Sequence, residues 1–163
     1  MEERQARVSA IGLRPVRAGD VPAVVDIVRA VLAEFGLEFG VGSATDDDVL
    51  RLPGSYWEAG GMFWVAEDPC GEILGTCGVY PVEPGTLELR KMYVRPEARG
   101  RGVGRLLLDH AIAEARASGA RRIVLDTLHT MQAAVHVYER AGFARDDAQI
   151  RGARCTRGYR LDL

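Results

Sequence analysis

Arginine and glycine alternate in residues 99–105, directly before a stretch with the spacing of an amphipathic helix. Gly100, Gly102 and Gly104 carry no side chain, so a ligand can approach the backbone closely there. No Ser, Thr, Asp or Asn stands at the expected N-cap, and the first N–H groups of the helix are therefore predicted to be open. Open N–H groups, the positive end of the helix dipole and the arginines together favour a phosphate or pyrophosphate. The alternative is a glycine turn on a solvated basic surface.

The glycines fit neither of the two common nucleotide-binding loops. A nucleotide-hydrolase loop, G-x-x-x-x-G-K-[ST], needs a Lys that is missing here. A dinucleotide loop, G-x-G-x-x-G, would need a glycine at Arg105. Asp126 lies about 20 residues further on, at the end of the next predicted strand, where a dinucleotide fold carries its ribose-binding acid. A dinucleotide-binding oxidoreductase therefore stays open as an alternative.

Two motifs of the chain resemble those of the GNAT superfamily of N-acetyltransferases. RGRGVG in residues 99–104 follows a strand that ends Met92-Tyr93-Val94, and it resembles the acyl-CoA signature Q/R-x-x-G-x-G/A. AVHVYERAGF in residues 134–143 resembles A-x-x-x-Y-x-x-x-G-F of the same superfamily. The resemblance implies a mixed α/β fold: a twisted, mostly antiparallel central sheet with helices on both sides. Two central strands of such a sheet splay apart to form an acetyl-CoA cleft.

The resemblance also implies that acetyl-CoA is the co-substrate and that no metal is needed. Tyr93 and Val94 would pair with the pantetheine arm through their backbone, and the Val94 N–H would donate to the thioester carbonyl. Met131 stands where many relatives carry an Asn that helps to hold the cofactor. Thr130 or Gln132 could substitute, or the pantetheine could pack on the Met131 thioether. The residues predicted to contact the cofactor are Met92, Tyr93, Val94, Arg99, Gly100, Arg101, Gly102, Val103, Gly104, Arg105, Met131 and Ala134.

Transfer of an acetyl group to an amine needs a base and an acid. A lysine-like amine has a pKa of about 10.4 and arrives protonated, so a carboxylate must take its proton, usually through water. Glu88 lies on the strand that resembles the one carrying a catalytic glutamate in some GNAT members, and we predict it as the base. The alternative is that Glu88 pairs with Arg90 or with a neighbouring strand. Asp126 is a weaker candidate base, with a structural role expected.

Tyr138 matches the general acid of the superfamily, which would protonate the leaving thiolate. A phenol with a pKa of about 10 stays protonated at neutral pH and can donate a proton. The alternative is a tyrosine that packs the helix and places its hydroxyl at the rim. Tyr138 and Glu88 are the predicted catalytic residues.

Hydrophobic periodicity predicts the elements that must position these residues. The helix after the glycine loop has an apolar stripe of Gly104, Leu107, Leu108, Ala111, Ile112 and Ala115. Another helix is predicted from Asp20, as its N-cap, to Gly36, and a third over 132–141, closed by Gly142. The first strand is expected at a sheet edge because it contains Pro15. The predicted strands span 11–16, 62–67, 73–80, 86–94, 122–126 and 159–163.

The run Asp46-Asp47-Asp48 lies in the least regular part of the chain, which the resemblance places at the acceptor site. Asp46 is expected to be the N-cap of a short helix. The alternative is that the three acids attract a cationic acceptor.

The 163 residues carry a formal net charge of -2 and are expected to form one domain, residues 1–163. This charge gives no support for a nucleic-acid partner. Cys70, Cys77 and Cys155 have no C-x-x-C spacing, so neither a disulfide framework nor a zinc site is indicated. Residues 1–9 are expected to be frayed, and no apolar run is long enough for a membrane span. A cytoplasmic protein is predicted, and the last strand leaves a homodimer open.

The sequence as a whole predicts an acetyl-CoA-dependent N-acetyltransferase. A primary amine on a small molecule or peptide would attack directly within a ternary complex, because no grouping of Cys, Ser and His supports a covalent acyl-enzyme. An amino acid, a polyamine, an aminoglycoside and a protein amine are all open as acceptors. The main functional alternative is a non-catalytic acyl-CoA-binding sensor or regulatory domain.

Overall fold

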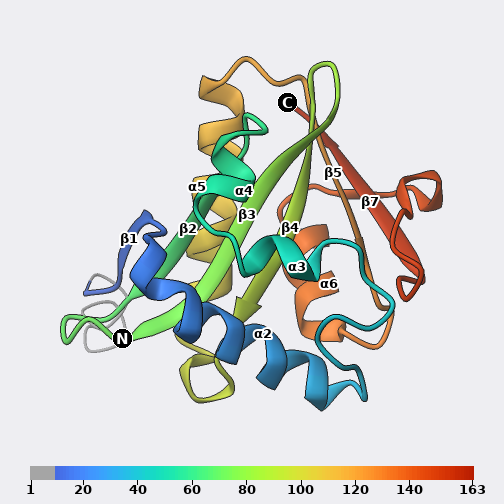
Figure 1. Ribbon diagram of the computed structural model, residues 1–163. Coiled ribbons are helices and arrows are strands. Elements are labelled where there is room, and N and C mark those ends of the chain that lie inside the picture. The colour runs from blue at the N-terminus through green and yellow to red at the C-terminus, as the bar shows by residue number, and fades with distance from the viewer. Residues whose placement is uncertain (1–9) are drawn as a thin grey trace.

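Seven strands form one sheet in the order β1-β2-β3-β4-β5-β7-β6 (Figure 1). The computed structural model describes residues 10–163, so the expectation for residues 1–9 lies outside it. Neighbouring strands are antiparallel except β4 and β5, which are parallel. The predicted mixed α/β fold with a mostly antiparallel sheet is thereby confirmed. The strands are β1 (Gly12–Pro15), β2 (Met62–Glu67), β3 (Ile73–Glu83), β4 (Thr86–Val94), β5 (Arg122–Thr127), β6 (Ala144–Arg145) and β7 (Arg157–Asp162).

Helices cover both faces of the sheet, as predicted (Figure 1). The first face carries α5 and α6, and the second carries α2, α3 and α4. These helices are α2 (Val21–Glu34), α3 (Asp46–Val49), α4 (Gly54–Trp57), α5 (Val103–Ala117) and α6 (Gln132–Arg140). Three short 3-10 helices span Ala18–Asp20, Pro96–Ala98 and Asp147–Gln149.

Strand alternation divides the buried side chains of β2 between two hydrophobic cores. Trp64 and Ala66 face the core under α5 and α6, whereas Phe63 and Val65 face the core under α2, α3 and α4. Successive side chains of a strand point to opposite faces of the sheet, so a strand buried on both faces is apolar throughout. The stripe predicted for α5 is buried in the first core from Leu107 onward.

The sheet opens between β4 and β5, which is the splay that the family resemblance implies. The two strands pair at three positions only, and the last pair is Glu88 with Val124. Beyond Glu88 the remaining residues of β4 have no partner in β5. Backbone groups of β4 that face this gap are therefore available to a ligand.

A β-bulge lies in β4 beside this opening. Pairing with β3 passes from Tyr93 opposite Thr76 to Arg90 opposite Gly78. The intervening Lys91 has φ 54, and its carbonyl accepts a hydrogen bond of 2.7 Å from Thr76 Oγ1. A bulge locally turns side chains away from the regular alternation, and here it does so at the wall of the opening.

Asp20 is the N-cap residue of α2, as predicted, but its carboxylate makes no capping hydrogen bond, because it pairs with Arg14 and accepts from the Arg17 N–H. The predicted N-cap role of Asp46 is wrong. Asp46 is the first residue of α3 and caps nothing, because its carboxylate is buried in an ion pair with Lys91. In addition, β3 extends to Glu83, past the turn predicted from Pro81.

Candidate active site

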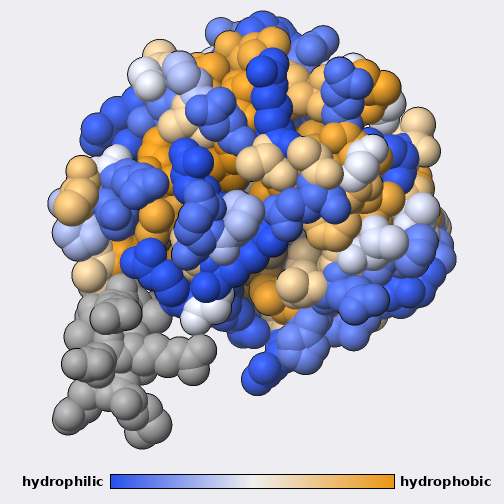
Figure 2. All heavy atoms as spheres, turned by 90° about the horizontal axis from the view of Figure 1, so that it is seen from below, coloured by the Kyte–Doolittle hydropathy of each residue, from blue (hydrophilic) through white to orange (hydrophobic). Residues whose placement is uncertain are grey.

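A cavity of about 820 Å³ passes from one helical layer to the other through the opening between β4 and β5. Its lining includes Val31 and Leu32 of α2 on one side, and Ala134 and Tyr138 of α6 on the other. Figure 2 views the end of the molecule where β4 finishes; hydrophilic side chains cover much of this face, with hydrophobic ones visible between them. The volume is typical of a pocket for a small molecule or cofactor.

The arginine–glycine loop forms one end of the cavity. Gly100 and Gly102 have φ 77 and 79, in the left-handed region where glycine is the favoured residue. Gly102 is the N-cap of α5, and no side chain caps this helix, as predicted. Gly100, Gly102, Val103 and Gly104 all line the cavity. This end therefore offers the positive terminus of a 15-residue helix to an anion.

The three arginines of the loop have different surroundings. Arg99 lines the cavity and makes a bidentate ion pair with Glu34 at the end of α2, with both distances 2.7 Å. This pairing lowers the pKa of Glu34. Arg105 lines the cavity and pairs with Asp109 one helical turn on. Arg101 is outside the lining, and its contact with a phosphate stays a prediction.

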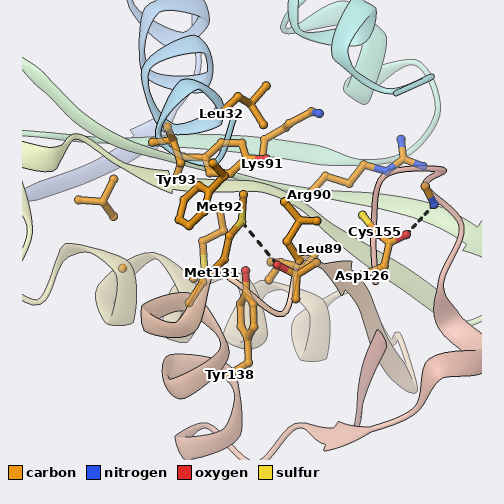
Figure 3. Close-up of a pocket in the computed structure, with 18 of the residues that line it drawn as sticks. Leu32, Leu89, Arg90, Lys91, Met92, Tyr93, Asp126, Met131, Tyr138 and Cys155 are labelled. Carbon is orange, nitrogen blue, oxygen red and sulfur yellow. Dashed lines mark hydrogen bonds between the residues drawn. The ribbon is translucent and has the colours of Figure 1, made fainter. Parts of the chain in front are cut away.

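The middle of the cavity is apolar and contains the other predicted cofactor contacts. Met92, Tyr93 and Val94 line it from β4, and Met131 and Ala134 line it from the other side of the opening. Figure 3 shows Met92 and Met131 near each other, with Tyr93 beside them.

The Met131 thioether has a defined contact where many relatives carry an Asn. Thr127 Oγ1 lies 3.7 Å from Met131 Sδ, within the range of a weak hydrogen bond to sulfur. Thr130 and Gln132, the two suggested substitutes for the Asn, are not part of the lining. The apolar contact is therefore the alternative that the geometry favours.

Tyr138 stands in the wall of the cavity with its hydroxyl directed toward β4 (Figure 3). The residue is 6% exposed, and its ring packs against Phe143 and Tyr159. Burial raises the pKa of Tyr138 well above its ordinary value, with the neighbouring Cys77 acting in the same direction. The phenol is thus neutral at physiological pH and able to donate a proton.

Glu88 lines the cavity from β4, and its contacts agree with both interpretations of its role, as a base and as an ion-pair partner. Its Oε1 accepts a hydrogen bond of 2.6 Å from Arg90 Nε, which is the pairing considered as the alternative. Its Oε2 is buried and has no hydrogen-bond partner among residues 10–163. Arg151 Nη1 is 3.6 Å from this oxygen, beyond hydrogen-bond distance. One oxygen therefore orients the carboxylate, and the other is available to a ligand.

Sequence reasoning missed a buried charged cluster of Asp46, Lys91 and Arg154. Asp46 is fully buried, pairs with the Lys91 ammonium and accepts two hydrogen bonds from Arg154, of 3.1 and 3.0 Å. Burial acts to raise the pKa of Asp46, but hydrogen bonds from Lys91, Gly40 and Arg154 outweigh it, and the pKa lies below its usual range. Neither predicted role of Asp46, helix capping or attraction of a cationic acceptor, describes it.

The pKa of Lys91 is lowered as well, even though Lys91 has an anionic partner. Burial is the main cause, and repulsion from Arg154 and Arg90 adds to it, against the attraction of Asp46. The lowered pKa values of Asp46 and Lys91 are consistent with each other. Two cations favour the charged form of Asp46, whereas Lys91 has one carboxylate and two like charges beside it. Nothing in the local sequence indicated this cluster, since its members are 45 and 108 residues apart.

Asp126 holds a loop of the cavity wall in place. Its Oδ2 accepts hydrogen bonds of 2.7 Å from the backbone N–H groups of Arg151 and Gly152. This is the structural role expected for Asp126, and it uses the carboxylate that a dinucleotide fold would direct to a ribose. Cys155 lies in the same wall, where burial and Asp126 raise its pKa to about 12.

Among residues 10–163, no group of three or more His, Cys, Asp or Glu side chains is arranged to hold a metal ion. No helix in the same range has the length and apolar character needed to cross a membrane.

Comparison with known proteins identifies relatives of this architecture. A family model described as the acetyltransferase (GNAT) family matches residues 29–143. The chain is 34% identical over 139 residues to the uncharacterized N-acetyltransferase YjgM of Escherichia coli (strain K12), and the match covers 83% of each chain.

Solved structures share the fold at lower identity. A GNAT-family acetyltransferase from Staphylococcus aureus Mu50 superimposes with a TM-score of 0.85 at 22% identity, over 94% of this chain and 99% of that one. The acetyltransferase yncA from Salmonella typhimurium, solved with its cofactor acetyl-CoA, has a TM-score of 0.75 at 22% identity and covers 94% of each chain. The family match spans well over half of the sequence and agrees with the splayed sheet. The chain therefore belongs to the GNAT family of N-acetyltransferases.

Proposed function

We propose that this chain transfers an acetyl group from acetyl-CoA to a primary amine of a small molecule or peptide, by direct attack in a ternary complex. The observation that carries this proposal is the placement of Tyr138 and Glu88 in the wall of one cavity. Tyr138 lines the cavity from α6 and Glu88 lines it from β4. The cavity begins at the uncapped N-terminus of α5. An acid, a base and an anion-binding end thus share one continuous space.

The cavity has the features that acetyl-CoA requires. The diphosphate would lie on the N–H groups at the start of α5, with Arg99 and Arg105 beside it. The pantetheine arm would run between β4 and β5, where backbone groups of β4 after Glu88 lack a partner in β5. Met92, Met131 and Ala134 would pack on this arm. The complex of Salmonella typhimurium yncA with acetyl-CoA supports the choice of ligand.

Acetyl-CoA supplies an acyl group activated as a thioester. The Val94 N–H would polarise the thioester carbonyl. Glu88 Oε2 would take a proton from the attacking amine, directly or through water, as the nitrogen bonds to the acetyl carbon. Tyr138 would give its proton to the sulfur as the carbon–sulfur bond breaks. A phenol is protonated at neutral pH, and burial, which raises the pKa of Tyr138, further favours this neutral form.

Replacing Tyr138 by phenylalanine tests the proposal, because only the hydroxyl is removed. We expect Tyr138→Phe to lower kcat by about 10²- to 10⁴-fold while the Kd for coenzyme A, measured by calorimetry, stays within about twofold. Tyr159→Phe is the matched control. Tyr159 packs beside Tyr138, but its hydroxyl donates to Glu139 at 2.9 Å, and it does not line the cavity. An unchanged kcat in Tyr138→Phe would remove this residue as the acid.

A further inference from the structure

In the cavity wall, one oxygen of the Glu88 carboxylate makes only a long ion pair with Arg151. Glu88 is 4% exposed, and among the described residues its Oε2 has no hydrogen-bond partner. A buried carboxylate oxygen without a donor is costly, so such an oxygen indicates a place for a ligand donor. An ammonium or amine is the donor that the proposed reaction brings there.

Two other carboxylates near this part of the cavity accept hydrogen bonds from the protein. Asp46 accepts hydrogen bonds from Lys91, Arg154 and the Gly40 N–H. Asp126 accepts two backbone N–H groups of the loop that carries Arg151. Among these three carboxylates, Glu88 is the one with a buried oxygen that has no hydrogen-bond partner in the described residues.

Positive charge is plentiful in the same wall. Arg90, Lys91, Arg151 and Arg154 all line the cavity. Three of them are nearly buried, whereas the side chain of Arg151 is 35% exposed. Within the described residues, the Arg151 side chain donates one hydrogen bond, from Nη2 to the exposed Glu83 carboxylate, at 3.2 Å. Its Nη1 makes an ion pair with Glu88 Oε2 at 3.6 Å, beyond hydrogen-bond distance, so one ligand can contact both groups.

The pair of Glu88 and Arg151 presents opposite charges at a spacing that matches an α-amino acid. The amine and carboxylate of an α-amino acid are held roughly 3 Å apart by their bonds. An amine on Glu88 Oε2 would place the neighbouring carboxylate at the Arg151 guanidinium, which binds planar anions through two donors. A polyamine or an aminoglycoside has no carboxylate for the Arg151 guanidinium and would bring additional positive charge beside it.

We infer that the acceptor is a free α-amino acid, with its amine at Glu88 and its carboxylate at Arg151. This inference rests on the proposed function, because it assigns the acceptor half of the same cavity. It makes Arg151 a residue that determines specificity for the acceptor and takes no part in acetyl-CoA binding.

The test compares acceptors that have an α-carboxylate with acceptors that lack one. The twenty common L-amino acids, their α-carboxamides and spermidine are each assayed for release of coenzyme A, with the acetylated product identified by mass spectrometry. Arg151→Gln is assayed beside Arg116→Gln, a control with the same loss of charge at an exposed position on α5, outside the cavity.

We expect at least one amino acid to have a kcat/KM about tenfold or more above that of its carboxamide. In Arg151→Gln its KM should rise by about 10- to 100-fold, while kcat and the KM for acetyl-CoA stay within about twofold. Arg116→Gln should behave as the unchanged chain. Equal or faster acetylation of carboxamides or of spermidine would overturn the inference and leave the proposed function standing. Acetylation of no acceptor in the panel would count against the proposed function itself.

Discussion

Each oxygen of the Glu88 carboxylate has a different environment. Oε1 is held by Arg90 at 2.6 Å, and the Arg90 guanidinium is itself fixed over the Tyr80 ring, 4.0 Å from its centroid. The carboxylate is thereby oriented before a substrate arrives, and Oε2 is left for proton transfer. Such preorganisation lets a base act without first breaking a hydrogen bond of its own.

Glu88→Gln keeps the shape of the side chain and removes the base. We expect kcat/KM near pH 7 to fall by about 10²-fold or more. The remaining rate should rise about tenfold per pH unit up to the pKa of the acceptor amine, because only amine that is already deprotonated can then attack. The measurement is a pH–rate profile. Glu72→Gln is the control, since Glu72 is exposed in the turn between β2 and β3 and does not line the cavity. A variant profile parallel to the original one would contradict the role of Glu88.

How well single residues could be predicted depends on where their partners lie in the chain. The glycine loop and Tyr138 were identified because each belongs to a short motif whose geometry is local. The Glu34–Arg99 and Asp46–Arg154 pairs join residues 65 and 108 positions apart, so no local pattern indicates them. Asp46 was assigned to the end of a helix because acids are common there, and burial against Lys91 was the stronger effect.

At the scale of elements, the Asp46 cluster ties three segments together beside the cavity. Asp46 begins α3, Lys91 lies in the bulge of β4, and Arg154 comes from the loop that precedes β7. Arg154 also donates to the Val41 carbonyl, at 3.1 Å. The loop before α3 is therefore held against the central strand by charge as well as by packing.

Asp46→Asn should destabilise the protein strongly, because it leaves Lys91 and Arg154 buried without their anion. We expect the free energy of unfolding at pH 7 to fall by about 3–5 kcal/mol in urea titrations. Asp109→Asn, which breaks the exposed pair with Arg105, should cost about 0.3–0.5 kcal/mol. The pKa of Asp46 is lowered on folding, so its contribution exists above its ordinary value of 3.8 and is lost as the pH falls through the folded pKa. Equal losses in the two variants would show that the cluster contributes no more than a surface pair.

The elements themselves were largely predictable, for physical reasons that differ between them. The stripe of α5 repeats over several turns, and β2 is a continuous apolar run, so the observed bounds follow the predicted ones. The bulge at Lys91 was not predicted, because it depends on the register between β3 and β4 rather than on either sequence alone. The opening between β4 and β5 came from the family resemblance and not from periodicity.

At the scale of the whole molecule, several ionisable groups are buried in their neutral form. Burial raises the pKa of Tyr93 to about 12, with Arg154 opposing it, and raises the pKa of Cys155 to about 12. Burial also raises the pKa values of Tyr56, Tyr138 and Cys77. In the unfolded chain these groups would ionise near their ordinary values, 9.0 for the thiols and 10.0 for the phenols.

These raised pKa values predict that stability falls in alkali. The folded state holds the protons longer than the unfolded state, so stability is fully present below pH 9.0 and is lost as the pH rises through the folded pKa values. Each buried phenol contributes a loss of about 1.4 kcal/mol per pH unit above its ordinary pKa. Urea titrations should therefore give a constant free energy of unfolding from pH 7 to about pH 9 and a steep decline beyond it.

Tyr56→Phe separates this effect from a general weakening in alkali. Tyr56 belongs to α4, is fully buried, packs edge-to-face on Phe63 and Tyr80, and does not line the cavity. The substitution keeps the ring, so the hydrophobic contacts of the second core remain. Above pH 10.0 the variant should lose about 1.4 kcal/mol less per pH unit than the original chain, because one buried phenol no longer favours the ionised, unfolded state. Parallel curves for the two proteins would mean that Tyr56 ionises as readily in the folded state as in the unfolded one. In that case burial would not be holding its proton.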